Sequence, residues 1–145
     1  MAVRSGWEGY RQLVRRGFRY RLYPTLEQAL LMARSCGVAR LVYNASLEQR
    51  SLAYRLAGQS VGWAAQDAEW VALKKDPEFA WLTEVHSDVL GQSLRDLDTA
   101  FGRFCDGLAG DPRRHRKGER DSFRLCQRRI RNTRAGRVQR EHRGA

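Results

Sequence analysis

The chain has 145 residues and a formal net charge of +11, with 27 Lys and Arg against 16 Asp and Glu. That length suits one ordinary domain and leaves little room for a second. No apolar run approaches the roughly 18 residues of a membrane span, and three widely spaced cysteines without a Cys-x-x-Cys pair argue against a disulfide scaffold or a four-ligand zinc site. We therefore expect a cytoplasmic protein with no membrane association.

The positive charge is concentrated at the two ends. Residues 1–21 hold six Arg and one Glu, residues 113–145 hold thirteen Lys or Arg and three acids, and residues 22–112 hold eight basic and twelve acidic residues. Basic arms around a folded unit are typical of nucleic-acid-binding proteins, although a basic tail can also be a solvated end without a specific partner. The distribution favours a polyanionic partner.

The first predicted element is a β-strand over residues 16–24, preceded by an extension over residues 1–15. Apolar and basic residues alternate here, and side chains alternate between the two faces of a strand. The two faces carry Phe18, Tyr20 and Leu22, and Arg19, Arg21 and Tyr23. One face can pack and the other can contact phosphate, with a tyrosine stacking on an unpaired base. The alternative is that Tyr20 is core and the arginines only face water.

Two helices are predicted next. Thr25 and Gln28 have the spacing of a capping box, which predicts a helix from Leu26 to Cys36 that ends at Gly37. A second amphipathic pattern predicts a helix over residues 38–57. Two helices joined at a glycine make a helix-turn-helix geometry possible, but a plain helical hairpin is the commoner outcome.

Two more helices complete the predicted helical lobe of residues 25–107. The third covers residues 60–75, and Asp76-Pro77 interrupts it because proline disfavours helix at and before its own position. The aromatic residues that follow are expected to plug the end of the core. Ser87 can cap the fourth helix, which ends at Gly107 and has the clearest apolar stripe of the chain: Leu90, Leu94, Leu97, Phe101 and Phe104.

Residues 108–145 form a basic segment. Residues 121–125 predict a short strand, and the last twenty residues carry too few apolar side chains to offset their ordering entropy, so we expect that tail to be disordered unless bound. The predicted fold is therefore mainly α: a small bundle of about four helices, preceded by one β-strand and followed by a short strand and a basic tail.

The sequence contains no convincing catalytic constellation. Asp96 and Asp98 are two residues apart on a helix and point in different directions, and the three histidines lack partners at ligand spacing. No phosphate-cradling glycine loop occurs. We predict no enzyme activity, no metal site and no cofactor.

Binding chemistry remains. For Tyr43 and Asn44 a local structural role is the favoured alternative, whereas the cations after Gly107 have the strongest claim to phosphate contacts because so dense a cluster repels itself. The predicted nucleic-acid-binding residues are Arg16, Arg19, Tyr20, Arg21, Tyr23, Tyr43, Asn44, Arg113, Arg114, Arg116, Lys117 and Arg120.

Several segments together resemble a known family. They are Phe18–Thr25, Gln28, Arg40–Asn44, Leu73–Lys74, Trp81–Leu82, Leu94–Phe101, Phe104 and Asp121–Phe123. In order and approximate spacing they are similar to the N-terminal region of the OrfB/TnpB transposases of insertion sequences, which are relatives of type V CRISPR effectors. The resemblance covers roughly residues 16–125.

The resemblance implies that residues 16–23 are the first strand of a small wedge barrel, that residues 26–106 are a helical recognition lobe, and that residues 121–125 begin the return to the barrel. Full-length members are RNA-guided DNA endonucleases with a metal-binding RuvC-like nuclease and a zinc ribbon, and this sequence ends before either. We expect a truncated, catalytically inactive protein that binds structured RNA or DNA. The alternative is a non-binding remnant or an interaction module that regulates a full-length transposase, and self-association is possible through the unpaired strand.

Overall fold

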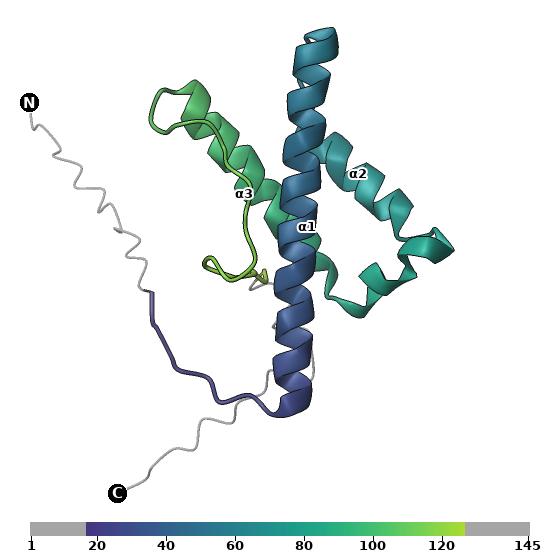
Figure 1. Cartoon of the computed structure of the whole chain (residues 1–145), viewed down its shortest axis with the longest axis vertical. Helices are drawn as coiled ribbons and strands as arrows, with labels where there is room; N and C mark the ends of the chain where they lie inside the picture. Colours follow the sequence, from purple (N-terminus) through teal and green to yellow (C-terminus); the bar gives the residue numbers. More distant parts are fainter. Residues whose placement is uncertain (1–16, 127–145) are drawn as a thin grey trace, which may run out of the picture.

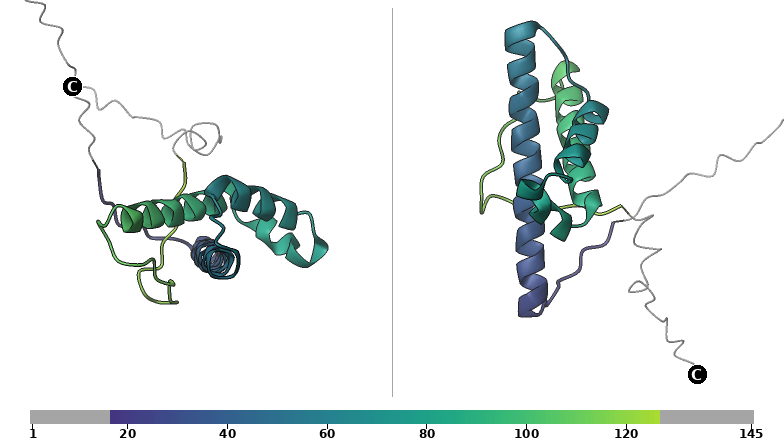
Figure 2. Two further views of the ribbon diagram at one scale, coloured as in Figure 1. Left: turned by 90° about the horizontal axis from the view of Figure 1, so that it is seen from above. Right: turned by 90° about the vertical axis from the view of Figure 1, so that its right-hand side faces the viewer.

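The computed structural model describes residues 17–126, which fold around one long helix (Figure 1). The order of elements is α1 (Leu26–Ala57), α2 (Trp63–Leu73), the 3₁₀-helix η1 (Pro77–Glu84) and α3 (Ser87–Cys105). α3 packs against both α1 and α2. The segment after α3 returns along α1 on the side opposite to α2, as the two further views show (Figure 2). The mainly helical fold class is confirmed for the described residues.

α1 begins at the predicted capping box. The Gln28 N–H donates to the Thr25 hydroxyl oxygen at 3.3 Å, and the Thr25 N–H donates to Gln28 Oε1 at 3.0 Å. Gly58 ends the helix with φ at +63°, a left-handed conformation that glycine adopts without steric cost.

The predicted break at Gly37 is wrong, because α1 runs through this position as one helix of 32 residues. The buried side chains continue across it at intervals of three and four, from Ser35 to Val38, Ala39 and Val42. A glycine inside a helix costs only about 1 kcal/mol relative to alanine, which this continuous buried face outweighs. No helical hairpin therefore forms within residues 26–57.

The later helices follow the prediction with shifted ends. α2 is shorter than the predicted helix over residues 60–75, and the helical structure is interrupted before Asp76-Pro77, as predicted. Asp76 Oδ1 accepts from the Glu78 N–H at 3.0 Å. η1 occupies the segment predicted to be an aromatic loop. α3 is capped by His86 rather than Ser87, because His86 Nδ1 accepts from the Asp88 N–H at 3.2 Å.

The core lies between α1, η1 and α3. Leu82 of η1 and Leu94 of α3 are fully buried against Val42 of α1, and burial of each leucine contributes roughly 1.5–3 kcal/mol. The predicted stripe of α3 is confirmed over Leu90, Leu94 and Leu97, whereas Phe104 stays partly exposed.

No β-strand occurs between residues 17 and 126, so the strands predicted over residues 16–24 and 121–125 are not confirmed. Residues 17–25, which we call the arm, are extended and exposed, but a strand requires a hydrogen-bonded partner and the described chain offers none. The extension over residues 1–15, Arg16 and the tail from residue 127 lie outside the described residues. No helix in the described part is long and apolar enough to cross a membrane.

Candidate nucleic-acid interface

Residues 111–126, which we call the strap, run back over α1 and are fixed there by Tyr43 and Asn44. Asn44 Nδ2 donates to the His115 carbonyl at 2.9 Å, and Asn44 Oδ1 accepts from the His115 N–H at 2.8 Å. The ring of Tyr43 stacks on the His115 ring with centroids 3.9 Å apart and planes 9° apart. His115 is thus held through its backbone N–H, its carbonyl and its ring by two adjacent residues of one helix.

Ion pairs and one aromatic ring hold the rest of the strap. Arg40 Nη1 lies 2.6 Å from Asp121 Oδ1, and Asp121 Oδ2 also accepts from the Gly118 N–H at 3.1 Å. Phe123 packs against the core between α1 and α3. Two further ion pairs join Arg114 to Glu48 and Arg124 to Asp96. The ion pairs are partly exposed and individually weak, so the hydrogen bonds and the packing carry most of the attachment.

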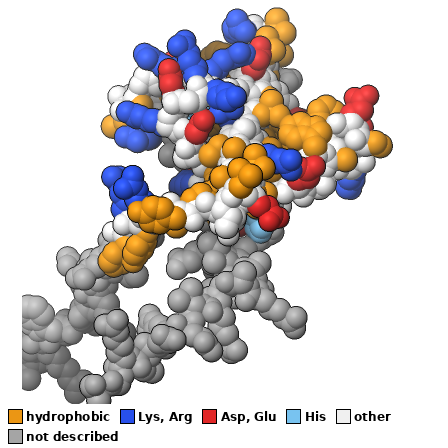
Figure 3. Space-filling model, turned by 60° about the horizontal axis from the view of Figure 1, so that its bottom comes forward, with side chains coloured by type: hydrophobic (Ala, Val, Ile, Leu, Met, Phe, Trp, Pro, Cys, Tyr) orange, Lys and Arg blue, Asp and Glu red, His pale blue; other side chains and the backbone are white. Residues whose placement is uncertain are grey.

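Four strap cations remain available for a partner. Arg113, Arg116, Lys117 and Arg120 are exposed, and none forms an ion pair within residues 17–126. The last three lie at a tight turn in which Gly118 and Arg120 have positive φ values of 82° and 54°. Figure 3 shows Lys and Arg side chains gathered in the upper part of the view, with individual acidic side chains between them. The strap therefore presents cations from an anchored backbone.

The arm presents a second exposed set. The side chains of Tyr20 and Tyr23 are 78% and 84% exposed, and Arg19 and Arg21 make no ion pair with any described residue. The rings of Phe18 and Tyr20 lie 6.4 Å apart and tilted. These residues have the chemistry of a base-stacking, phosphate-contacting segment, but no described contact fixes their geometry.

Tyr43 and Asn44 are placed differently from the exposed candidates. Tyr43 is 5% exposed and both ends of the Asn44 amide are engaged by the strap, so the structure uses both residues to position the basic segment. The partners Arg40, Glu48 and Asp121 were missed by the sequence reasoning. Contacts 66 to 81 residues apart leave no local spacing pattern, although opposite charges on α1 and on the strap are visible in the sequence.

Burial also shifts the pKa values of the two stacked rings, Tyr43 and His115. Burial raises the pKa of Tyr43 above its ordinary value. Burial lowers the pKa of His115, and the nearby Arg40 guanidinium lowers it further. The stacked imidazole is therefore neutral at neutral pH, and the side chain adds no charge to the strap.

A buried polar cluster links the three α-helices. Arg50 Nε donates to Gln66 Oε1 at 2.8 Å, and Arg50 Nη1 lies 3.1 Å from Asp98 Oδ1. Gln66 is fully buried and donates to the Ser46 carbonyl at 2.9 Å and to Gln49 Oε1 at 2.7 Å. Nη2 of Arg50 is buried without a hydrogen-bond partner in the described chain. This cluster was not anticipated from the sequence.

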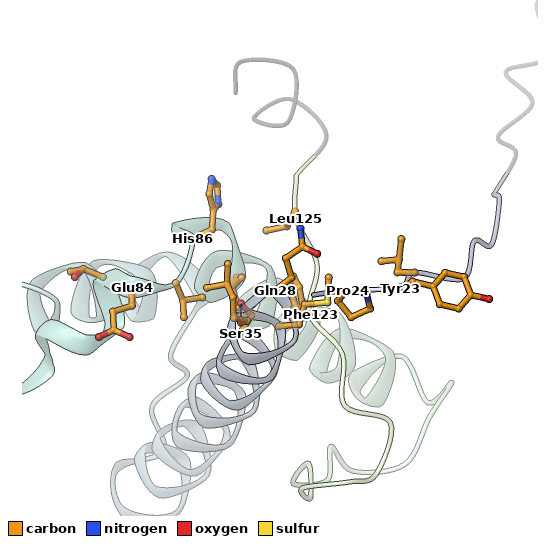
Figure 4. Close-up of a pocket in the computed structure, with 14 residues that line it drawn as sticks. Tyr23, Pro24, Gln28, Ser35, Glu84, His86, Phe123 and Leu125 are labelled. Atoms are coloured by element: carbon orange, nitrogen blue, oxygen red, sulfur yellow. Dashed lines mark hydrogen bonds between the residues drawn. The ribbon is translucent and has the colours of Figure 1, made fainter. Parts of the chain in front are cut away.

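An apolar groove of about 690 Å³, the foot groove, lies where α1 begins (Figure 4). Gln28 and Ser35 of α1, Glu84 and His86 before α3, and Phe123 and Leu125 of the strap surround it, while Tyr23 points away. Its lining residues are Leu22, Tyr23, Pro24, Gln28, Leu31, Met32, Ser35, Thr83, Glu84, Val85, His86, Val89, Phe123 and Leu125. Within residues 17–126, no three His, Cys, Asp or Glu side chains come together as metal ligands would.

Comparison with known sequences places the chain. The model of the OrfB/IS605 helix-turn-helix domain matches residues 14–59. A Streptomyces pristinaespiralis protein named "Putative RNA-guided DNA endonuclease" is 43% identical over 112 residues, which cover 77% of this chain and 28% of that relative. "Putative RNA-guided DNA endonuclease InsQ" of Escherichia coli K12 is 30% identical over 110 residues, covering 76% and 27%. "Virulence protein VsdF" of Salmonella dublin is 33% identical over 87 residues, covering 55% and 73%.

The chain thus spans little more than a quarter of the two relatives named as endonucleases, in their N-terminal part. The remainder of both relatives has no counterpart in these 145 residues, which confirms the expectation that the family's nuclease region is not among them. Of the residues matched by the helix-turn-helix model, the structure describes 17–59, which form the arm, α1 and the turn that follows it, with a single helix rather than two.

Proposed function

We propose that this chain, which belongs to the OrfB/TnpB insertion-sequence family through its N-terminal region, binds structured RNA or DNA in the cytoplasm through the strap and the arm. In this proposal Arg113, Arg116, Lys117 and Arg120 contact phosphates, as does Arg114 when it leaves Glu48. The arm adds Arg19 and Arg21 as phosphate contacts, with Tyr20 or Tyr23 stacking on an unpaired base.

The observation that carries the proposal is the anchored turn of the strap, whose cations form no ion pair. Arg116, Lys117 and Arg120 surround a single acid, Glu119, and none of the three pairs with a described residue. Asn44 holds the strap backbone at His115, while Tyr43 and Arg40 hold its side chains on either side of the turn. Like charges this close raise the free energy of the unbound state. A polyanion relieves that repulsion and releases its own counterions, and a fixed backbone reduces the ordering entropy lost on binding.

The test is the salt dependence of binding measured by fluorescence anisotropy with a labelled RNA hairpin and a labelled DNA duplex. With several phosphate contacts, the logarithm of the association constant should fall against the logarithm of salt concentration with a slope of about −4 or steeper. No binding at low salt to either probe, or binding that salt does not change, would contradict the proposal.

A charge-matched pair of variants locates the contact. The double variant Arg116→Gln with Lys117→Gln removes two strap cations and should reduce the steepness of the salt slope by about 2. Arg34→Gln with Lys75→Gln removes the same charge from exposed positions outside the strap and the arm, and should leave the slope nearly unchanged. If both double variants reduced the steepness of the salt slope equally, binding would depend on net charge alone.

A second candidate function is an interaction module that binds a full-length transposase or a second copy of this chain. The foot groove favours it, because Leu26, Leu30 and Leu31 of α1 are at least half exposed beside it. Contiguous apolar surface of this kind marks protein contacts. Analytical ultracentrifugation of the chain alone, and with a full-length relative, distinguishes this function from nucleic-acid binding.

A further inference from the structure

A second hollow lies at the other end of α1, between that helix, the end of α3 and the start of the strap. This strap groove has a volume of about 530 Å³, within the range of small-ligand sites. Its lining residues are Leu47, Glu48, Arg50, Ser51, Tyr54, Arg55, Phe101, Phe104, Asp111, Pro112 and Arg114. Of the nucleic-acid-binding residues predicted from the sequence, Arg114 is the one that lines this groove.

The lining combines exposed aromatic surface with hydrogen-bonding groups that are mostly paired. Tyr54 is 70% exposed and Phe104 43% exposed, so both rings are open to a partner. Glu48 is paired with Arg114, and Arg50 with Asp98. The groove therefore has aromatic faces without a large excess of positive charge, which suits a flat, uncharged ring better than a phosphate group.

Arg50 adds a hydrogen-bond donor that would favour a ring with polar atoms at its edge. The residue is 8% exposed and lines the groove, its Nε and Nη1 are engaged, and its guanidinium carbon lies 5.3 Å from the centre of the Phe101 ring. Nη2 has no acceptor among the described residues. A buried donor without a partner is costly, so a ligand acceptor that reaches Nη2 after a small turn of the guanidinium toward the groove would be favoured.

We propose that the strap groove receives one unpaired nucleobase of a bound single strand, stacked on Tyr54 or Phe104 with its polar edge toward Arg50 and Asp111. This rests on the proposed function, because Arg113 and Arg116 of the strap supply the phosphate contacts that bring the strand to the mouth of the groove. Stacking accepts every base, so the groove adds a preference for single strands rather than for a sequence.

The experiment compares a fluorescein-labelled 12-nucleotide poly(A) strand with a 12-base-pair duplex. Of Tyr54→Ala and Phe104→Ala, the variant that removes the stacking ring should weaken binding of the single strand about tenfold, because one stacked base contributes about 1–3 kcal/mol. Both variants should leave duplex binding and the salt slope unchanged. Tyr54→Trp should retain binding of the single strand. Leu56→Ala is the matched control, since Leu56 is an exposed apolar residue of the same helix outside the groove.

The outcomes separate the two proposals. If the unaltered chain binds neither probe at low salt, the proposed function fails and the groove proposal fails with it. If it binds the single strand and the Tyr54 and Phe104 variants bind equally well, only the groove proposal is overturned. Equal weakening for single strand and duplex, or loss of helical circular dichroism in these variants, also overturns it, because the effect would then be structural.

Discussion

The strap and the arm are both basic, irregular segments, yet the structure fixes only one of them. The strap is bound at its backbone by Asn44, at the His115 ring by Tyr43 and through the Asp121 carboxylate by Arg40. The arm has comparable chemistry, with two arginines and three aromatic rings, but no side chain of the described protein binds its backbone before Thr25. Composition therefore does not decide which segment is ordered.

The difference matters for binding. A cation on a fixed backbone contacts phosphate at a small entropic cost, whereas a cation on an unanchored segment must also offset the ordering of its chain. We therefore expect the strap to determine affinity and the arm to adapt to the partner. Substitutions that loosen the strap should therefore cost more stability than substitutions in the arm.

The largest effect is expected from Phe123→Ala, which removes the ring that joins the strap to the core. A fully buried phenylalanine costs about 3–5 kcal/mol when truncated, and because Phe123 is half-buried we expect about 2 kcal/mol. Urea unfolding measures the loss. Leu125→Ala in the same segment is the control, since that side chain is exposed, and it should cost less than half as much. A Phe123→Ala protein as stable as the parent would show that the strap is not part of the fold.

Asn44→Ala removes both hydrogen bonds to the His115 peptide, and we expect a loss of about 1–2 kcal/mol in strap attachment. Hydrogen exchange measures it directly: the His115 amide should exchange about tenfold faster, since 1.4 kcal/mol corresponds to a factor of ten. Amides of α2 serve as the internal control and should keep their rates. Uniform acceleration across all helices would mean that Asn44 stabilises the whole fold instead.

How much of this was visible in the sequence depends on the range of the contacts. The capping box at Thr25, the break at Asp76-Pro77 and the stripe of α3 were predicted because each depends on residues within a few positions of one another. The continuity of α1 through Gly37 was not, because glycine punctuation outweighed a buried face whose members Tyr43, Ser46 and Leu47 were not recognised as core.

The site shows the same limit. The exposed cations of the strap were identified from their density alone, whereas the roles of Tyr43 and Asn44 depend on a segment 71 residues later in the chain. The sequence showed only that Tyr43 and Asn44 lie within an apolar helix face. That pattern is compatible with contacts to nucleic acid and equally with contacts to another segment of the same chain. The strands failed for the complementary reason, because an alternating pattern gives a segment's two faces but not its hydrogen-bonded partner.

Acid should loosen the strap before it unfolds the helices. Burial, and then Arg40, lower the pKa of His115 in the folded state, so the unfolded chain binds this proton at a higher pH than the folded chain. Stability from the stacked ring is complete above the unfolded pKa of about 6.5 and is lost as the pH falls below it toward the folded value. His115→Phe keeps an aromatic stack on Tyr43 but has no titrating group. In this variant, amide hydrogen exchange near residue 115 should no longer accelerate at acid pH. A parent protein with flat exchange between pH 7.5 and 5.5, after correction for intrinsic rates, would contradict this.

The smallest effect on stability is expected from Tyr20→Ala in the arm. Its ring is mostly exposed and lies beside the Phe18 ring, which is exposed too, so the free energy of unfolding should change by less than about 0.5 kcal/mol. Its effect on binding should be larger, because a base stacked on the ring would be lost: about fivefold for single-stranded poly(A) by anisotropy, with the duplex unaffected. Arg21→Gln at the neighbouring position is the control for charge, and it should weaken binding of both the single strand and the duplex. If Tyr20→Ala destabilised the protein by more than 1 kcal/mol, the arm would be part of the folded unit, and its contrast with the strap would disappear.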